Sequence, residues 1–206
     1  MTSGASAGQP RANHSVSKEA LRARLRAARA SRVSDAADAL LTSHTLRLSA
    51  GAGVVAAYVS RADEPDTSAL IEELHRAGVR VLLPVLRREP DWAWYEGPGT
   101  LADGPLGIRR PTGRPLGADA LALADVVWVP GLAGTVRGDR LGTGGGWYDR
   151  ALTFARADAI LGLLLFDDEV LAELPTDAWD RPVHLLVTPL RVLTCGLGDG
   201  SELGPA

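Results

Sequence analysis

The chain has 206 residues, of which 46% are hydrophobic and 23% charged, and its formal net charge is -3. This composition is typical of a soluble globular protein and excludes a disordered or fibrous chain. Only one lysine, Lys18, occurs among the 22 basic residues, an imbalance typical of a GC-rich coding sequence. A GxxxxGK[ST] phosphate loop, a Schiff-base lysine and a Ser/Lys dyad each need a lysine within the fold, so these sites are excluded.

The charge and the rare residue types also limit the partners. A net negative chain has no global positive field to hold nucleic acid or an anionic membrane. The single Cys195 cannot form an internal disulfide, and the four histidines lack paired metal-ligand spacing. The longest apolar run, residues 160–166, is too short to span a bilayer, and the first residues lack the basic-then-apolar order typical of a signal peptide. We predict a cytoplasmic protein without nucleic-acid or membrane partners. The oligomeric state is open, with a monomer expected.

The chain is predicted to hold one domain between two tails. Residues 1–15 are small and polar with no apolar period, so we expect a disordered N-terminal tail. Residues 16–195 are assigned to a single α/β domain, and residues 196–206 to a C-terminal tail.

Helical and strand patterns alternate along this domain. A helix starts at Ser17, whose side chain can cap it, and a second covers residues 34–48. Then follow, in order, a strand at 54–59, a helix at 67–77 with Thr67 as N-cap, strands at 79–83, 91–96 (antiparallel or edge) and 126–129, a glycine-rich loop, a helix at 148–156, and strands near 159–165 and at 183–187. This order predicts a three-layer α/β/α domain with a mostly parallel sheet and a glycine-rich phosphate loop before a helix.

The glycine-rich loop is the segment that points to chemistry. Glycines occupy four of the five positions 142–146, so backbone N–H groups can approach an anion closely, and the following helix start adds positive dipole. Arg140 offers a planar fork to phosphate oxygens, and Asp149 offers a carboxylate for Mg²⁺ beside them. Trp147 and Tyr148 have rings that can stack on a planar ligand. About a dozen residues separate the loop from its strand, so it is not a Rossmann fingerprint.

The residues 129–133, VPGLA, and 140–150, RLGTGGGWYDR, resemble the signature of the 5-formyltetrahydrofolate cyclo-ligase family, also called methenyltetrahydrofolate synthetase. The similarity continues in element order from Lys18 to Pro189. Shorter matching pieces are the K-x-x-x-R of Lys18 and Arg22, the acidic segment 63–67, and the late segment 175–180. Taken without the resemblance, these pieces are a solvated helix face, a helix start and a loop acid.

The resemblance implies a site for ATP, a reduced folate and Mg²⁺. Lys18 and Arg140 are the implied catalytic residues, and Asp149 and Asp180 the implied metal ligands. The implied folate-binding residues are Tyr58, Val59, Glu64, Trp147 and Tyr148. The implied ATP-binding residues are Lys18, Arg22, Arg140, Leu141, Gly142, Thr143, Gly144, Gly145, Gly146, Trp147 and Tyr148.

The implied activity is the ATP- and Mg²⁺-dependent conversion of 5-formyltetrahydrofolate to 5,10-methenyltetrahydrofolate, with release of ADP and phosphate. The γ-phosphoryl group activates the formyl oxygen, and the folate nitrogen at position 10 closes the ring. Such phosphoryl transfer needs positioning and charge neutralisation rather than a protein nucleophile.

The sequence departs from the family pattern at several positions. Arg110 stands where Glu is usual, Gly134 and Thr135 replace an aromatic or aliphatic residue and an Asp, and His184 replaces a second late Asp. Trp147 replaces the commoner Tyr or Phe. Two alternatives therefore stay open. One is an ATP-dependent enzyme for another formylated or carboxylated small molecule, with Arg110 recruiting an extra anion, and the other is a catalytically silent nucleotide- or folate-binding protein. The sequence also leaves open whether Trp92 and Trp94 serve the core or an interface.

Overall fold

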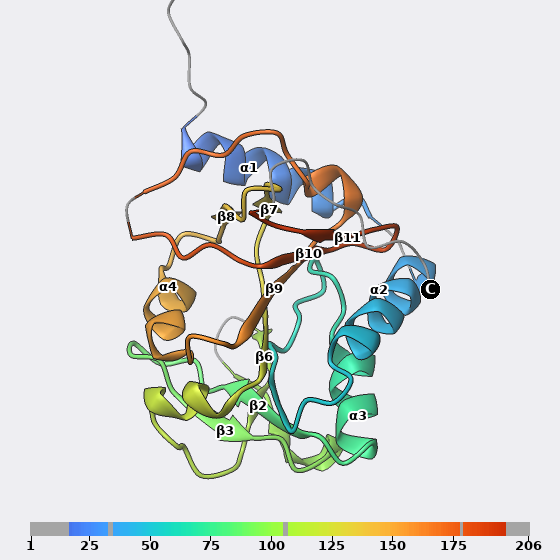
Figure 1. The fold of residues 1–206 in the computed structure, drawn as a ribbon, viewed down its shortest axis with the longest axis vertical. Helices are drawn as coiled ribbons and strands as arrows, with labels where there is room; N and C mark the ends of the chain where they lie inside the picture. The colour runs from blue at the N-terminus through green and yellow to red at the C-terminus, as the bar shows by residue number, and fades with distance from the viewer. Residues whose placement is uncertain (1–16, 33–34, 105–106, 178, 197–206) are drawn as a thin grey trace, which may run out of the picture.

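A computed structural model describes residues 17–32, 35–104, 107–177 and 179–196 (Figure 1). The predicted N-terminal tail lies outside these residues, and so does the predicted C-terminal tail apart from Gly196. Among the described residues, no helix has both the length and the apolar character needed to cross a bilayer.

One seven-stranded sheet forms the centre of the fold. Its order is β11-β10-β9-β6-β1-β2-β3, and all neighbouring strands from β10 to β2 are parallel. The two edge strands, β3 and β11, run antiparallel to their neighbours. The strands are β1 (Val54–Ala56), β2 (Arg80–Pro84), β3 (Trp92–Trp94), β6 (Val126–Val129), β9 (Ile160–Leu164), β10 (Leu185–Val187) and β11 (Val192–Thr194).

Helices cover both faces of this sheet (Figure 1). Because side chains alternate along a strand, Val55 packs with α2 (Asp35–Leu48) and α3 (Ser68–Arg76), whereas Ala56 faces the opposite layer. That layer contains the 3-10 helix η3 (Ala118–Leu123), α4 (Trp147–Ala151) and η4 (Leu152–Phe154). The central strands are therefore buried on both sides, as their apolar runs predict. The three-layer α/β/α prediction is confirmed.

A smaller apolar cluster attaches the first helix. Ser17 accepts a hydrogen bond from the backbone N–H of Ala20 at 3.2 Å, as predicted for the cap of α1 (Lys18–Arg29). Leu21 and Leu25 of α1 pack against a hairpin made of β7 (Ala133–Gly134) and β8 (Arg140–Leu141). The other short elements are η1 (Pro98–Thr100), β4 (Leu101–Ala102), β5 (Arg110–Pro111) and η5 (Asp167–Glu169).

Several predicted boundaries were wrong. The first strand ends at Ala56 rather than at residue 59. Thr67 precedes α3 but does not cap it with its side chain, because its hydroxyl donates to the carbonyl of Tyr58 at 2.6 Å. Asp66 accepts from the N–H of Ser68 instead. The helix predicted at 148–156 is the short α4 followed by η4. The β7–β8 hairpin and β11 were not predicted.

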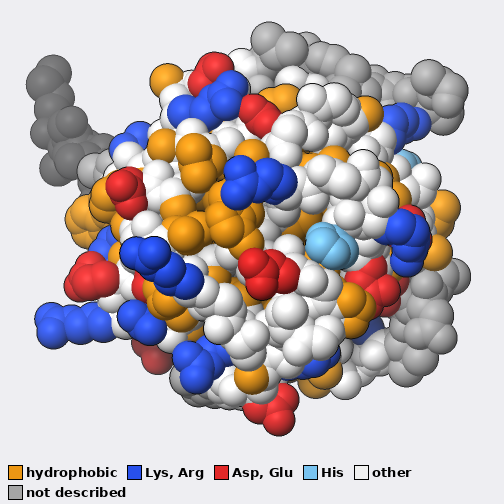
Figure 2. Space-filling model, turned by 90° about the horizontal axis from the view of Figure 1, so that it is seen from below, with side chains coloured by type: hydrophobic (Ala, Val, Ile, Leu, Met, Phe, Trp, Pro, Cys, Tyr) orange, Lys and Arg blue, Asp and Glu red, His pale blue; other side chains and the backbone are white. Residues whose placement is uncertain are grey.

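The two tryptophans of β3, Trp92 and Trp94, make contacts within the domain. Trp92 is completely buried in the core. Trp94 is half-buried, and the Arg80 guanidinium lies 3.7 Å from its ring centroid. Figure 2 shows the face at the bottom of Figure 1, where hydrophobic side chains lie between charged ones.

A buried ion pair fastens α1 to the rest of the domain. Arg29, at the end of α1, donates to both carboxylate oxygens of Glu169 at 2.7 Å, and each side chain is only 1% exposed. Arg29 also donates to the carbonyl of Gly131 at 2.6 Å, and Glu169 accepts from the N–H of Phe166 at 3.0 Å. The pair therefore joins the helix to η5 and to the chain leaving β6.

We predict that Glu169→Gln destabilises the protein by about 3–5 kcal/mol, because it leaves the Arg29 charge buried without a compensating carboxylate. Urea unfolding measures this loss. Asp158→Asn is the control, since Asp158 pairs with Arg156 at the surface, and we expect little change.

The double variant Arg29→Met/Glu169→Leu separates lost charge balance from lost packing. It should recover part of the stability, because apolar side chains of similar volume often replace a buried pair without cost. A Glu169→Gln protein as stable as the original would contradict this interpretation of the pair.

Candidate active site

A pocket of about 720 Å³ lies where α1, the glycine-rich loop and the loops after β1, β2 and β6 meet. In open α/β sheets, ligands bind beyond the carboxyl ends of the parallel strands, and the loops after β1, β2 and β6 begin there. The pocket is lined by every residue that the sequence assigned to ATP, folate or metal: Lys18, Arg22, Tyr58, Val59, Glu64, Arg140, Leu141, Gly142, Thr143, Gly144, Gly145, Gly146, Trp147, Tyr148, Asp149 and Asp180. The individual roles of these residues stay predictions.

Two arginines of α1 hold the glycine-rich loop by its carbonyl groups. Arg22 Nε donates to the carbonyl of Gly142 at 2.9 Å, and Arg26 donates to that of Thr143 at 2.8 Å. Gly144 and Gly146 have φ of 108° and 62°, which residues with a Cβ rarely adopt. Within the described part of the chain, the N–H groups of residues 143–146 donate no hydrogen bond. The carbonyls of Gly142 and Thr143 are thus bonded to arginines, while the N–H groups of residues 143–146 have no acceptor in the described ranges. Free N–H groups of this kind suit an anion.

Arg140 and Asp149 form an ion pair beside this loop. Arg140, on β8, is only 8% exposed and donates through one terminal nitrogen to Asp149, in the first turn of α4. The buried Nε of Arg140 has no hydrogen-bond partner among the described residues. A guanidinium with an unused buried donor is available to an oxygen-rich ligand.

Lys18 is held between two carboxylates. Its ammonium lies 2.6 Å from Asp177 and 2.7 Å from Asp180. Burial alone would lower the pKa of Lys18, but hydrogen bonds and charge from the two carboxylates outweigh it and raise the pKa. Burial likewise raises the pKa of Asp180, yet the bond from Lys18 leaves it below its ordinary value. Both groups are therefore charged at neutral pH.

The carboxylates of the pocket suit a metal that arrives with phosphate. The described residues contain no group of three or more His, Cys, Asp or Glu side chains that could hold a metal. Asp149 and Asp180 nevertheless line the same pocket, and the Arg140 charge acts on both. Mg²⁺ usually takes one or two carboxylates, with phosphate oxygens and water as its other ligands. This donor set fits Mg²⁺ bound together with a nucleotide.

The side of the pocket formed by the loop after β1 is less charged. The Tyr58 hydroxyl donates to the carbonyl of Pro65 at 3.2 Å, and Glu64 accepts from the N–H of Arg61 at 2.9 Å. Burial raises the pKa of Glu64 and that of Tyr148. The Tyr148 hydroxyl is buried and, among the described residues, unpaired. Beside Arg61, this side offers the apolar surface of Tyr58 and Val59 and the carboxyl group of Glu64, which suits a flat ring that carries hydrogen-bond donors.

Trp147 and Tyr148 link the glycine-rich loop to the loop after β2. Their rings meet edge to face with centroids 4.9 Å apart, and Trp147 meets the buried Trp92 in the same way at 5.5 Å. Trp147 Nε1 donates to the carbonyl of Arg87 at 3.2 Å, and Arg150 donates to that of Arg88 at the same distance. The positions of the two loops are therefore coupled.

Sequence reasoning missed several residues at this site. The contact of Arg26 with the glycine-rich loop could have been predicted, because Arg26 lies one helical turn after Arg22 on the same face. The sequence indicates Asp177 less clearly, through its position three residues before Asp180. No sequence pattern pointed to Arg61, Arg87 and Arg88, which line the pocket. Ile108 and Trp179 also line it; they lie in segments that resemble the family but were not assigned a role.

Four of the five departures from the family pattern lie outside the pocket lining, and the fifth, Trp147, is part of it. Arg110 is exposed on β5. At Gly134, a Cβ would lie 2.8 Å from Leu163 and Leu186 atoms, so a larger residue does not fit this backbone. Thr135 is buried and donates to Asp139 at 2.6 Å. His184 accepts from the N–H of Leu161, near the start of β9 and β10. The residues at positions 134 and 135 therefore fit their buried surroundings.

Known proteins support the similarity that the glycine-rich loop suggests. Residues 14–189 match the profile of the 5-formyltetrahydrofolate cyclo-ligase family. The chain is 40% identical over 144 residues to the 5-formyltetrahydrofolate cyclo-ligase of Mycolicibacterium smegmatis, which covers 66% of this chain and 74% of that protein. It is 36% identical over 148 residues to the Escherichia coli K12 protein of the same name, covering 68% and 80%.

Solved structures agree with the sequence comparison. The NMR structure of Aquifex aeolicus 5,10-methenyltetrahydrofolate synthetase matches with a TM-score of 0.73 and 29% identity, over 91% of this chain and 96% of that one. The family profile spans most of the present chain, and the fold agrees over nearly its whole length. The chain belongs to the 5-formyltetrahydrofolate cyclo-ligase family.

Proposed function

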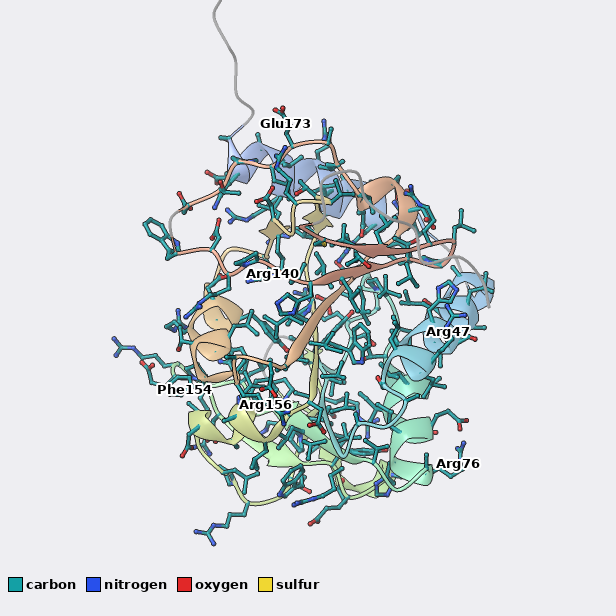
Figure 3. The ribbon with its side chains drawn as sticks, viewed as in Figure 1. Arg47, Arg76, Arg140, Phe154, Arg156 and Glu173 are labelled. Carbon is teal, nitrogen blue, oxygen red and sulfur yellow. The ribbon has the colours of Figure 1, made fainter. Side chains whose placement is uncertain are left out.

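We propose that this protein converts 5-formyltetrahydrofolate to 5,10-methenyltetrahydrofolate, using ATP with Mg²⁺ and releasing ADP and phosphate. The observation that carries the proposal is one pocket that combines three cations, the free N–H groups of the glycine-rich loop, two carboxylates and an apolar wall. Among the charged residues that line the pocket, the three cations assigned to ATP are Lys18, Arg22 and Arg140, and the two carboxylates assigned to metal are Asp149 and Asp180. In Figure 3, Arg140 is labelled between α1 and α4. The relatives named above support the same activity.

The proposed reaction begins with activation of an unreactive carbonyl. The N-formyl group is an amide, so its carbon is a poor electrophile. Transfer of the γ-phosphoryl group of ATP to the formyl oxygen breaks the bond to ADP and makes that carbon electrophilic. The folate nitrogen at position 10 then attacks, loses its proton, and phosphate leaves with the formyl oxygen as the ring closes.

The protein residues supply positioning and charge neutralisation for this transfer. Arg140 and the N–H groups of residues 143–146 are placed to bind phosphate oxygens, and Mg²⁺ held by Asp149 and Asp180 would neutralise further charge. Glu64 and Tyr58 line the wall that would take the folate ring. No nucleophile is required, and Cys195 lies outside the pocket lining with its pKa raised by burial to about 11.

Lys18 exchanges partners in this proposal. Asp177 and Asp180 hold its ammonium, so a phosphate oxygen must take over at least one of these contacts. A lysine ammonium is a compact charge on a flexible stem and can turn between partners, whereas a guanidinium is planar and larger.

Neither alternative activity gains support from the structure. Arg110 was the reason to consider a substrate with an extra anion, but it is exposed outside the pocket lining. A protein that only binds nucleotide would not need Asp149 and Asp180 on the same pocket as Lys18 and Arg140. Cytoplasmic location and a monomeric state stay predictions from the sequence.

We predict that Lys18→Arg lowers turnover by about 100-fold, because the larger fork cannot reproduce the contact of the ammonium with phosphate. Formation of the methenyl product, followed by its near-ultraviolet absorbance, measures the effect. Arg24→Lys, on the exposed side of the same helix, is the matched control and should keep full activity. Full activity of Lys18→Arg would show that Lys18 has no specific role.

We further predict that Asp149→Asn abolishes most of the activity, since it removes a carboxylate for Mg²⁺ and leaves Arg140 without its charge partner. The activity is measured while the Mg²⁺ concentration is raised, and excess Mg²⁺ should restore only part of it. Asp158→Asn, which alters a surface ion pair with Arg156, should behave as the original protein. An unchanged Mg²⁺ dependence in Asp149→Asn would contradict the assignment.

A further inference from the structure

Trp179 is an exposed tryptophan at the rim of the pocket. Its side chain is 71% exposed, a fraction that among the large hydrophobic residues described only Leu190 equals. Leu190 does not line the pocket, whereas Trp179 does. An exposed indole leaves a large apolar surface in water, which is typical of residues that bind a partner or a ligand.

Asp177 and Asp180, on either side of Trp179 in the sequence, bond to each other and to α1. The N–H of Asp180 donates to the carbonyl of Asp177 at 3.0 Å, and the N–H of Asp177 donates to the Asp180 carboxylate at 2.8 Å. Lys18 binds both carboxylates, which fastens this turn to α1. Upstream, Leu174 packs in the same apolar cluster as Leu21 of α1. Trp179 therefore directly precedes a residue, Asp180, that is bound to Lys18 of α1.

Two cations assigned to phosphate act on Asp180, the neighbour of Trp179. Lys18 contacts the turn directly, and the charge of Arg140 acts on Asp180. The residues assigned to folate, Tyr58 and Glu64, come from the loop after β1. Trp179 thus belongs to the nucleotide side of the pocket.

We propose that Trp179 is the stacking surface for the adenine ring of ATP, an inference that rests on the proposed function. The turn that positions the Lys18 ammonium for the phosphates would then also place a flat ring against the base. Stacking on an aromatic side chain needs only the face of the base, so no buried polar partner for adenine is required.

Replacing the indole tests this assignment. Trp179→Ala should raise the KM for ATP about tenfold and leave the KM for 5-formyltetrahydrofolate unchanged, while Trp179→Phe should retain most of the affinity. Leu190→Ala is the matched control, because it removes an equally exposed apolar side chain outside the pocket, and both KM values should stay the same.

Tripolyphosphate separates stacking from damage to the Lys18 turn, since it has the phosphates of ATP but no base. Its inhibition constant with Mg²⁺ should be the same in the original protein and in Trp179→Ala. An equal loss of affinity for ATP and tripolyphosphate would overturn the proposal, because the effect would then act on the phosphates. A raised KM for the folate alone, or no change in either KM, would also overturn it.

Direct binding keeps this test independent of turnover. MgATP should quench the fluorescence of the original protein more than that of Trp179→Phe, and its dissociation constant for Trp179→Ala should rise about tenfold. If the original protein binds ATP in this way but does not convert 5-formyltetrahydrofolate, the proposed function fails while the stacking assignment stands.

Discussion

The buried pair of Arg29 and Glu169 fixes the helix on which the phosphate side of the pocket depends. Helix α1 lies outside the central sheet, and its buried contacts with the domain are a small apolar cluster and this pair. Lys18, Arg22 and Arg26 add polar contacts nearer the surface. Two charged side chains that are each 1% exposed lose most of their hydration, so only their mutual contacts and the bonds to backbone groups compensate. These contacts leave α1 little freedom to move relative to η5 and the chain after β6. A displaced α1 would move Lys18 and Arg22 together.

Helix α1 in turn fixes the backbone of the glycine-rich loop. Arg22 and Arg26 bind two loop carbonyls, and the donors of the following peptide groups remain unpaired. An isolated loop of this composition would be free to adopt many conformations, because glycine has little backbone preference. The two arginines select one of them before any ligand binds. Preorganisation of this kind lowers the entropy that ligand binding must overcome.

The sequence could predict the sheet and the loop because both have local signals. Continuous apolar runs indicate buried parallel strands, and four glycines in five positions leave few alternatives to a turn or an anion loop. The β7–β8 hairpin has two-residue strands with no alternation to detect, so it was missed. The cap at Thr67 was wrong because a distant carbonyl, that of Tyr58, competes for the hydroxyl. Such competition depends on tertiary contacts and leaves no local pattern.

The charge of the pocket also differs from that of the chain. Seven basic and four acidic side chains line it, which leaves a formal excess of +3 in a protein of net charge -3. The basic residues are Lys18, Arg22, Arg61, Arg87, Arg88, Arg140 and Arg150, and the acidic ones are Glu64, Asp149, Asp177 and Asp180.

A global charge count therefore excludes binding of an extended polyanion but not of small anionic substrates in one cleft. Three of the four acids bind cations of the pocket: Asp177 and Asp180 bind Lys18, and Asp149 binds Arg140. Under the proposed function, a triphosphate would take over contacts that the Lys18 ammonium makes with carboxylate oxygens. This exchange suits the single lysine, whose three donors can turn on a flexible stem, better than any of the arginines around it.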